Sequence, residues 1–344
     1  MKKYTIVFII LIIVVLSIII AVYINKEKPI TDKPITQIPT FSLISAIPFD
    51  LKPNNALLAE NKLIIFGRNG AYIISPEKPV IDEDTKFSSE EYETALYHRE
   101  SKLLFLRSKT KTDIYRLMDD LNLIDTISTR PTKFGGFPIN SGYSTFVYLV
   151  DSNSIITYNT KTKKKTISEY ETDASLEGVI ELDGKIIGNI VDEESGGIYM
   201  SFLDQDSSFS NVTLNGRESV IGKITYVDGN YFLLGVPCYC EIRLLANNIE
   251  IIKNFSNSKP GSLNSLVINN DILIGFYEDN SYELFDINSP IKEILPFATG
   301  TLPFITSKYE SIMHVFNTDN QNELIIITID NTSIGNIYKV KFQP

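Results

Sequence analysis

The chain contains two cysteines, Cys238 and Cys240, and a single tyrosine separates them. On an extended strand, residues i and i+2 point to one side with their α-carbons about 6.5 Å apart, near the limit for a disulfide. An oxidising compartment would allow a strained bridge there, and such a bridge would be easily reduced. Two packed free thiols, or a functional thiol or metal pair, are the alternatives. We therefore retain Cys238 and Cys240 as a possible disulfide.

Two histidines, His98 and His314, are the other side chains suited to proton transfer or metal binding. They share no motif, and lone histidines of this kind are more often structural than catalytic. The acidic runs at 82–84, 192–194 and 204–206 lack the D-x-D-x-D-G spacing and distal glutamate of a calcium loop. No G-x-S-x-G elbow is present for a serine nucleophile. The sequence thus predicts no cofactor, no metal site and no catalytic residue.

Composition limits the class of protein. The chain has 344 residues, is 43% hydrophobic, and has many Ile, Tyr, Phe and Asn residues but no Trp. This profile is that of a globular protein with a preference for β-structure. The formal net charge is −10 and the pI is about 4.9, so the basic surface that neutralises phosphates is missing. Nucleic acid is therefore excluded as an expected partner.

The segment Tyr4–Ile24 is uncharged and strongly apolar. As a helix it would be roughly 31 Å long, which matches the hydrocarbon thickness of a bilayer. A cleaved signal peptide is the alternative, but its apolar core is usually shorter and ends in small residues. We expect an uncleaved signal anchor, with residues 1–24 forming a cytoplasmic tip and one transmembrane helix.

Basic residues indicate the orientation of this span. Lys2 and Lys3 precede it, and the short N-terminal tail ahead of a long C-terminal domain favours a cytoplasmic N-terminus, although Lys26 and Lys28 weaken the contrast. The rest of the chain is then extracytoplasmic. Without Lys2 and Lys3 it has 30 basic and 42 acidic residues, a net charge of −12. Such a domain should be repelled by an anionic lipid surface.

Residues 25–40 have the composition of a linker. The tetrapeptide Lys-Pro-Ile-Thr occurs twice, and Pro29, Pro34 and Pro39 are five residues apart. Regular prolines favour an extended polyproline II conformation, in which 15 residues would reach about 45 Å. A disordered junction with no fixed length is the alternative.

A pattern of two short strands joined by a polar turn occurs seven times between residues 60 and 342. A tyrosine marks the second strand of each copy, at Tyr72, Tyr115, Tyr158, Tyr199, Tyr239, Tyr282 and Tyr338, with gaps of 43, 43, 41, 40, 43 and 56 residues. We name the two strands of this pattern B and C. In each copy an apolar strand, A, precedes them. A fourth strand, D, follows them, as at 123–129 and 291–297. A period near 42 residues built only of strands is typical of a propeller with four-stranded blades.

By this layout, residues 41–344 resemble the seven-bladed β-propellers of the WD40 and quinoprotein-like kind, an all-β fold. The resemblance covers period and strand pattern only, because the Gly-His and Trp-Asp signatures and the tryptophan docking motif are absent. The last blade ends at Pro344 without a D strand. We expect the stretch 41–47, FSLISAI, to supply that strand and to close the ring.

Two functions remain open for such a domain, since a propeller does not determine activity. The first is a non-catalytic scaffold that binds a protein or glycan partner outside the membrane. The second is a polysaccharide lyase or glycoside hydrolase of the cell envelope, with acidic residues at the mouth of the channel.

The B–C turns and D–A connections of a propeller emerge on one side, so the B–C turns predict one surface. Their charged residues form a basic sector opposite an acidic arc, a pattern suited to orienting a charged partner. Asp and Asn also suit turns for purely local reasons, which is the alternative for the acidic residues. The candidate binding face comprises Arg68, Arg107, Lys109, Lys111, Asp151, Asp192, Glu193, Glu194, Glu278, Asp279 and Asp330.

Overall fold

The structure, a computed structural model, describes most of the chain beyond residue 38. The described residues are 39–49, 53–76, 80–118, 121–130, 139–140, 145–151, 154–169, 175–182, 184–191, 198–203, 209–211, 213–214, 221–227, 229–236, 239–245, 248–256, 263–320, 322–332 and 334–344. Residues Pro39–Pro344 form one compact unit. Among the residues described, no helix is long and apolar enough to cross a membrane. The predicted span Tyr4–Ile24 and the linker up to residue 38 lie outside the described residues.

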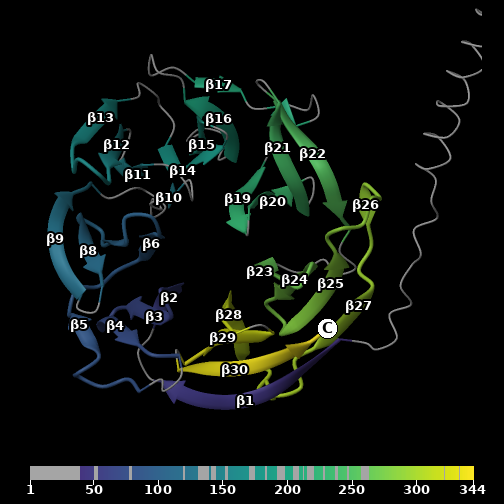
Figure 1. Ribbon diagram of the computed structural model, residues 1–344. Coiled ribbons are helices and arrows are strands. Elements are labelled where there is room, and N and C mark those ends of the chain that lie inside the picture. Colours follow the sequence, from purple (N-terminus) through teal and green to yellow (C-terminus); the bar gives the residue numbers. More distant parts are fainter. Residues whose placement is uncertain are drawn as a thin grey trace, which may run out of the picture. The chain divides into compact units, whose positions relative to one another are not determined.

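Seven antiparallel sheets account for the strands of the described residues, and they are arranged in a ring (Figure 1). The chain is therefore a seven-bladed β-propeller, as the repeat predicts. Within each blade the strands run from A, nearest the centre of the ring, to D at its rim. Each strand is antiparallel to the next, so successive connections alternate between the two faces of the ring.

The first three blades follow one another along the chain. Blade one comprises β2 (Pro53–Ala59), β3 (Lys62–Gly67), β4 (Gly70–Ile74) and β5 (Lys86–Ser88). Blade two comprises β6 (Thr94–His98), β7 (Leu103–Arg107), β8 (Lys111–Leu117) and β9 (Leu121–Ser128). Blade three comprises β10 (Ile139–Asn140), β11 (Phe146–Asp151), β12 (Ser154–Asn159) and β13 (Lys165–Glu169).

The next three blades continue in the same order. Blade four comprises β14 (Ser175–Leu182), β15 (Lys185–Val191), β16 (Ile198–Leu203) and β17 (Phe209–Asn211). Blade five comprises β19 (Ile221–Val227), β20 (Asn230–Val236), β21 (Tyr239–Leu245) and β22 (Asn248–Phe255). Blade six comprises β23 (Leu263–Asn269), β24 (Ile272–Tyr277), β25 (Ser281–Asp286) and β27 (Ala298–Thr301).

Blade seven joins the two ends of the propeller. It comprises β28 (Glu310–Asn317), β29 (Glu323–Asp330), β30 (Gly335–Gln343) and, as its D strand, β1 (Thr40–Phe49). β1 pairs with β30 from Thr40 opposite Gln343 to Phe49 opposite Gly335, with one irregularity between Leu43 and Ser45. The predicted closure by the N-terminal strand is confirmed (Figure 1).

The D strand of blade six differs from the prediction. We expected residues 291–297, but β27 (Ala298–Thr301) pairs with β25 instead. Within the predicted stretch, β26 (Glu293–Ile294) pairs in parallel with β22 of blade five. A second short strand, β18 (Thr213–Leu214), also pairs in parallel with β22. Ile294 of this stretch packs with Phe232 and Phe255 of blade five, whereas Ile291 and Leu295 are exposed.

The B strands show why the sequence folds in this way. In β3 the residues from Leu63 to Phe66 are all buried, because each side of the strand faces a neighbouring blade. Leu63 and Ile65 pack with residues of blade seven, whereas Ile64 and Phe66 pack with residues of blade two. Continuous apolar strands of this kind need cover on both faces, which only the ring supplies.

Tight A–B turns separate the first two strands of several blades. Asn61 (φ 56°) and Asp271 (φ 64°) adopt left-handed backbone conformations there, and Gly184 (φ 81°) and Gly229 (φ 94°) do the same. Asn, Asp and Gly tolerate this region best, and it matches the twist of a hairpin.

Alternating connections give the ring two faces, which we name by the turns they carry. The B–C face carries the B–C turns and the D–A connections. The C–D face carries the A–B turns and the C–D connections, so each D strand begins there. Because β1 is a D strand, the chain enters the propeller at Thr40 on the C–D face.

The closing strand contributes to the packing between blades. Phe41 is 6% exposed and its ring lies 4.7 Å from that of Tyr282 in blade six. We expect Phe41→Ala to lower the free energy of unfolding by about 3–5 kcal/mol. Leu43, which is 45% exposed on the same strand, is the matched control. Leu43→Ala should cost less than about 1 kcal/mol in urea unfolding. A loss of stability in Phe41→Ala as small as that in Leu43→Ala would show that Phe41 of β1 is not part of the core.

Candidate binding face

Part of the predicted face lies outside the described residues. This part comprises Asp192, Glu193 and Glu194 of the fourth B–C turn. Cys238 is also outside the described residues, so its disulfide with Cys240 stays a prediction. Cys240 itself is fully buried between blades four and five.

The basic residues of blades one and two meet acidic residues that sequence analysis did not place beside them. Arg68 Nε lies 4.0 Å from Glu91, and Lys111 Nζ lies 3.2 Å from Glu90. Both glutamates belong to the connection from β5 to β6, a D–A connection on the same face. Burial alone would lower the pKa of Lys111, but its bonds with Asp113 and Glu90 outweigh this effect and raise that pKa. The predicted basic sector is therefore a mixed surface of both signs.

Arg107 lies beneath this surface. Its side chain is 2% exposed, and its guanidinium donates to the carbonyl oxygens of Val150 and Arg130, the latter at 3.2 Å. Burial lowers the pKa of Arg107, and the nearby carboxylates of Asp151 and Glu93 oppose that change. Arg107 thus ties blade two to blade three instead of presenting its charge to solvent. Lys109, two residues further on, is exposed.

Asp151 has a similar supporting role in blade three. It is 8% exposed, and its carboxylate accepts hydrogen bonds from the backbone N–H and Nε of Arg130, the latter at 3.3 Å. Ser154 Oγ also donates to the Asp151 carbonyl oxygen at 2.9 Å. The pair places the Arg130 side chain, which is 65% exposed, on the B–C face. The exposed charge at this position is therefore the positive charge of Arg130, and the buried Asp151 carboxylate supports it from below.

The aspartates of blades six and seven stabilise their own turns. Asp279 Oδ1 accepts the backbone N–H of Ser281 at 3.1 Å. Asp330 Oδ1 accepts the backbone N–H groups of Thr332 at 2.8 Å and Ile334 at 2.9 Å. These are the local bonds for which Asp is favoured in turns. Glu278 is exposed and has no such bond to a described residue, so it presents the clearest acidic charge of these two turns.

A buried hydroxyl cluster fixes the D–A connection of blades one and two. Tyr92 is fully buried, and its hydroxyl donates to Asp113 Oδ2 at 2.7 Å and lies 3.1 Å from the Tyr115 hydroxyl. Burial raises the pKa of Tyr92, so the phenol stays protonated as a donor. The connection that carries Glu90 and Glu91 is held against strand β8 by these bonds.

Glu310 forms a comparable cluster at the start of the innermost strand of blade seven. Its Oε1 accepts hydrogen bonds from Tyr338 at 2.8 Å, from Asn336 at 2.9 Å and from Thr328. Asn280 of blade six donates to its carbonyl oxygen at 2.5 Å. Burial and the bond to Glu310 raise the pKa of Tyr338. Glu310 is the first residue of strand A of blade seven and not part of a B–C turn, so the pattern of B–C turns did not predict it.

Both histidines contact neighbouring side chains. His98 is 1% exposed and its Nδ1 lies 2.7 Å from Ser101 Oγ. His314 stacks on Phe316, with ring centroids 5.7 Å apart. Within the described part of the chain, no group of three or more His, Cys, Asp or Glu side chains is arranged to hold a metal ion.

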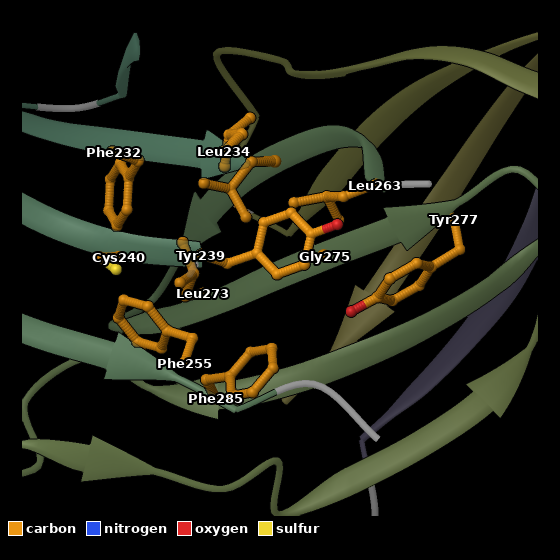
Figure 2. Close-up of a pocket in the computed structure, with 11 residues that line it drawn as sticks. Phe232, Leu234, Tyr239, Cys240, Phe255, Leu263, Leu273, Gly275, Tyr277 and Phe285 are labelled. Carbon is orange, nitrogen blue, oxygen red and sulfur yellow. The ribbon is translucent and has the colours of Figure 1, made fainter. Parts of the chain in front are cut away.

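A pocket lies between blades five and six, and Figure 2 shows its apolar and aromatic lining. Its main side chains are Phe232, Tyr239, Phe255, Leu273 and Tyr277. The cavity volume is about 10 Å³, close to the smallest that holds one water molecule. Small-molecule sites are typically about 300–1,000 Å³. This pocket is therefore a packing gap between two blades, and the B–C face remains the candidate site.

Comparisons with known proteins give no further assignment. No protein-family model matches the chain, and no curated protein is similar to it.

Arg107 and Lys109 provide a direct comparison between a buried and an exposed cation in one turn. We expect Arg107→Lys to lower the free energy of unfolding by about 2 kcal/mol or more, because an ammonium group cannot make both carbonyl bonds of the guanidinium. Lys109→Ser should change it by less than about 0.5 kcal/mol. Chemical denaturation of both variants measures this difference. Equal stabilities of the two variants would contradict the supporting role of Arg107.

Proposed function

We propose that the chain is a membrane-anchored, extracytoplasmic β-propeller whose B–C face binds a protein or glycan partner without converting it chemically. The observation that carries this proposal is that connections from different blades bring charged groups of both signs together on that face. Arg68 with Glu91, Lys111 with Glu90, and Arg130 with Asp151 are the described pairs. Charges held in this way orient and select a partner more than they raise affinity.

The anchor half of the proposal depends on the sequence. Tyr4–Ile24 has the length and apolarity of a membrane span. The linker that follows leads directly into β1, which is a structural part of the propeller. A pull on the linker would therefore act on a strand that pairs with β30 from Thr40 to Phe49, which suits a permanent tether.

An enzyme of the cell envelope, a polysaccharide lyase or glycoside hydrolase, is the second candidate, and Glu310 is the observation that favours it. Three donors hold one oxygen of this carboxylate in place, as pre-organised functional groups often are held. A glycoside hydrolase normally needs a second carboxylate about 5–9.5 Å away. Glu310 is 6% exposed, and two hydroxyls and one amide satisfy its carboxylate, as is usual for a buried structural carboxylate, so binding is the better supported function. Turnover of a glycan panel by the chain, lost in Glu310→Gln, would favour the enzyme.

Site-specific photo-crosslinking in living cells tests the binding face. A photoreactive amino acid would replace Lys109 or Glu278, which are exposed on the B–C face. Glu100 and Asp271, exposed in A–B turns on the opposite face, are matched control positions. We expect a discrete crosslinked product from the first pair of positions, which mass spectrometry would identify. The yield should fall as salt rises, because screening weakens exposed charges.

The control positions show which face of the ring binds the partner. Crosslinks from Glu100 and Asp271 without crosslinks from Lys109 and Glu278 would contradict the proposed face.

A further inference from the structure

The C–D turn of blade three carries a compact group of lysines. Four of the five residues in Lys161–Lys165 are lysine, and all five are exposed. We call this segment the lysine turn. Lys165 pairs with Asp125 of blade two at 3.0 Å. Lys161, Lys163 and Lys164 form no ion pair with any residue in the described part of the chain.

Hydrogen bonds of the Asn159 side chain and backbone fix the shape of the lysine turn. Asn159 Oδ1 accepts the N–H groups of Lys161 at 3.0 Å and Thr162 at 2.8 Å. The backbone N–H of Lys163 donates to the Asn159 carbonyl oxygen at 2.8 Å, and the backbone N–H of Asn159 donates to the Lys164 carbonyl oxygen at 2.9 Å. Lys163 adopts a left-handed conformation, φ 59°, where Asn or Gly would be less strained. The turn therefore has a fixed backbone and carries three exposed lysines that form no ion pair with a described residue.

The lysine turn lies on the face where the N-terminal segment enters. β13 begins at Lys165 and β1 begins at Thr40, and both are D strands. Each D strand begins on the C–D face, so the turn and the end of the linker share that face. The lysine turn therefore lies on the face of the propeller to which the N-terminal segment is attached.

We propose that the lysine turn binds anionic headgroups in the extracytoplasmic leaflet of the bilayer that holds the N-terminal span. This proposal rests on the proposed anchor. Each lysine near an anionic surface favours the bound orientation about fivefold, and this attraction acts within about 8 Å at physiological salt. The domain's net negative charge does not prevent the contact, because charges farther away are screened. Tethering removes most of the entropic cost of the encounter.

Acidic residues on the same face limit how the domain can lie. Asp82, Glu83 and Asp84 occupy the C–D connection of blade one, two blades away from the lysine turn, and Glu100 and Asp271 lie in A–B turns of blades two and six on this face. An anionic surface repels them while it attracts the lysines. The bound domain is therefore tilted, with blade three nearest the lipid and blade one farther from it.

Lysine acetylation of the full chain in nanodiscs tests this contact without a variant that could misfold. The chain is placed in discs of phosphatidylcholine alone, or with about 30% phosphatidylglycerol. Mass spectrometry then gives the labelling rate of each lysine. We expect Lys161, Lys163 and Lys164 to react at least about threefold more slowly in the anionic discs at about 0.05 M salt, and equally fast at about 0.5 M. Lys109 and Lys308, exposed on the B–C face, are the internal controls and should not change.

The outcomes separate the anchor from the lysine contact. Failure of the chain to co-elute with the discs would contradict the anchor and, with it, this proposal. Co-elution with equal labelling of the lysine turn in both discs would overturn the lipid contact alone. Protection by soluble dextran sulfate in neutral discs, without protection in anionic discs, would assign the turn to a free polyanion and also overturn it.

Discussion

The pairing of β1 with β30 is the interaction on which the rest of the structure depends. A blade of four strands buries its two faces only against neighbouring blades, so an open ring would expose the apolar faces beside the gap. β1 serves both sides of blade seven: Phe41 belongs to the cluster shared with blade six, and Phe49 belongs to the cluster shared with blade one. At Gly335, opposite Phe49, an added β-carbon would lie 2.1 Å from the Phe49 ring. Closure of the ring therefore includes a close contact between the Phe49 ring and the backbone of Gly335, which a larger residue at position 335 would prevent.

Closure also determines what the B–C face can do. The charged groups there come from different blades, and their relative positions hold only while the blades stay in contact. Polar bonds between blades reinforce this arrangement near the centre of the ring. Asn54 of blade one donates to the Tyr92 carbonyl oxygen at 2.9 Å, and Asn264 of blade six donates to the Ile312 carbonyl oxygen at 2.7 Å. A rigid backbone of this kind keeps the spacing of the charged residues constant, so binding a partner does not require the turns themselves to be ordered.

Much of the fold follows from the sequence because its signals are local and repeated. The spacing of the tyrosines predicts the seven blades, and the missing last strand predicts the role of β1. The D strand of blade six was not predicted, because residues 291–297 have an apolar pattern that suits the edge of another blade equally well. What distinguishes β27 is Gly300, where an added β-carbon would lie 2.6 Å from the hydroxyl of Tyr282 on the neighbouring strand. Only tertiary packing reveals that constraint.

The binding face is harder to read from the sequence, because residue type does not say whether a charge is exposed. Arg107 and Lys109 lie in one turn, yet the first is buried and the second is exposed. The difference arises from the carbonyl groups of Val150 and Arg130, which are distant in sequence. Glu90 and Glu91 were overlooked for a simpler reason. They come from a D–A connection, which shares the face with the B–C turns.

Native-state hydrogen exchange of the β1 amides that face β30 tests the central claim most directly. If β1 closes the ring, these amides become exposed only when the whole propeller unfolds. Their free energy of exchange should then equal that of the amides in β29, the central strand of the same blade, and change equally with denaturant. Exchange of β1 amides at a free energy lower by about 3 kcal/mol or more, roughly a hundredfold faster, would show that the strand detaches from a ring that stays intact without it.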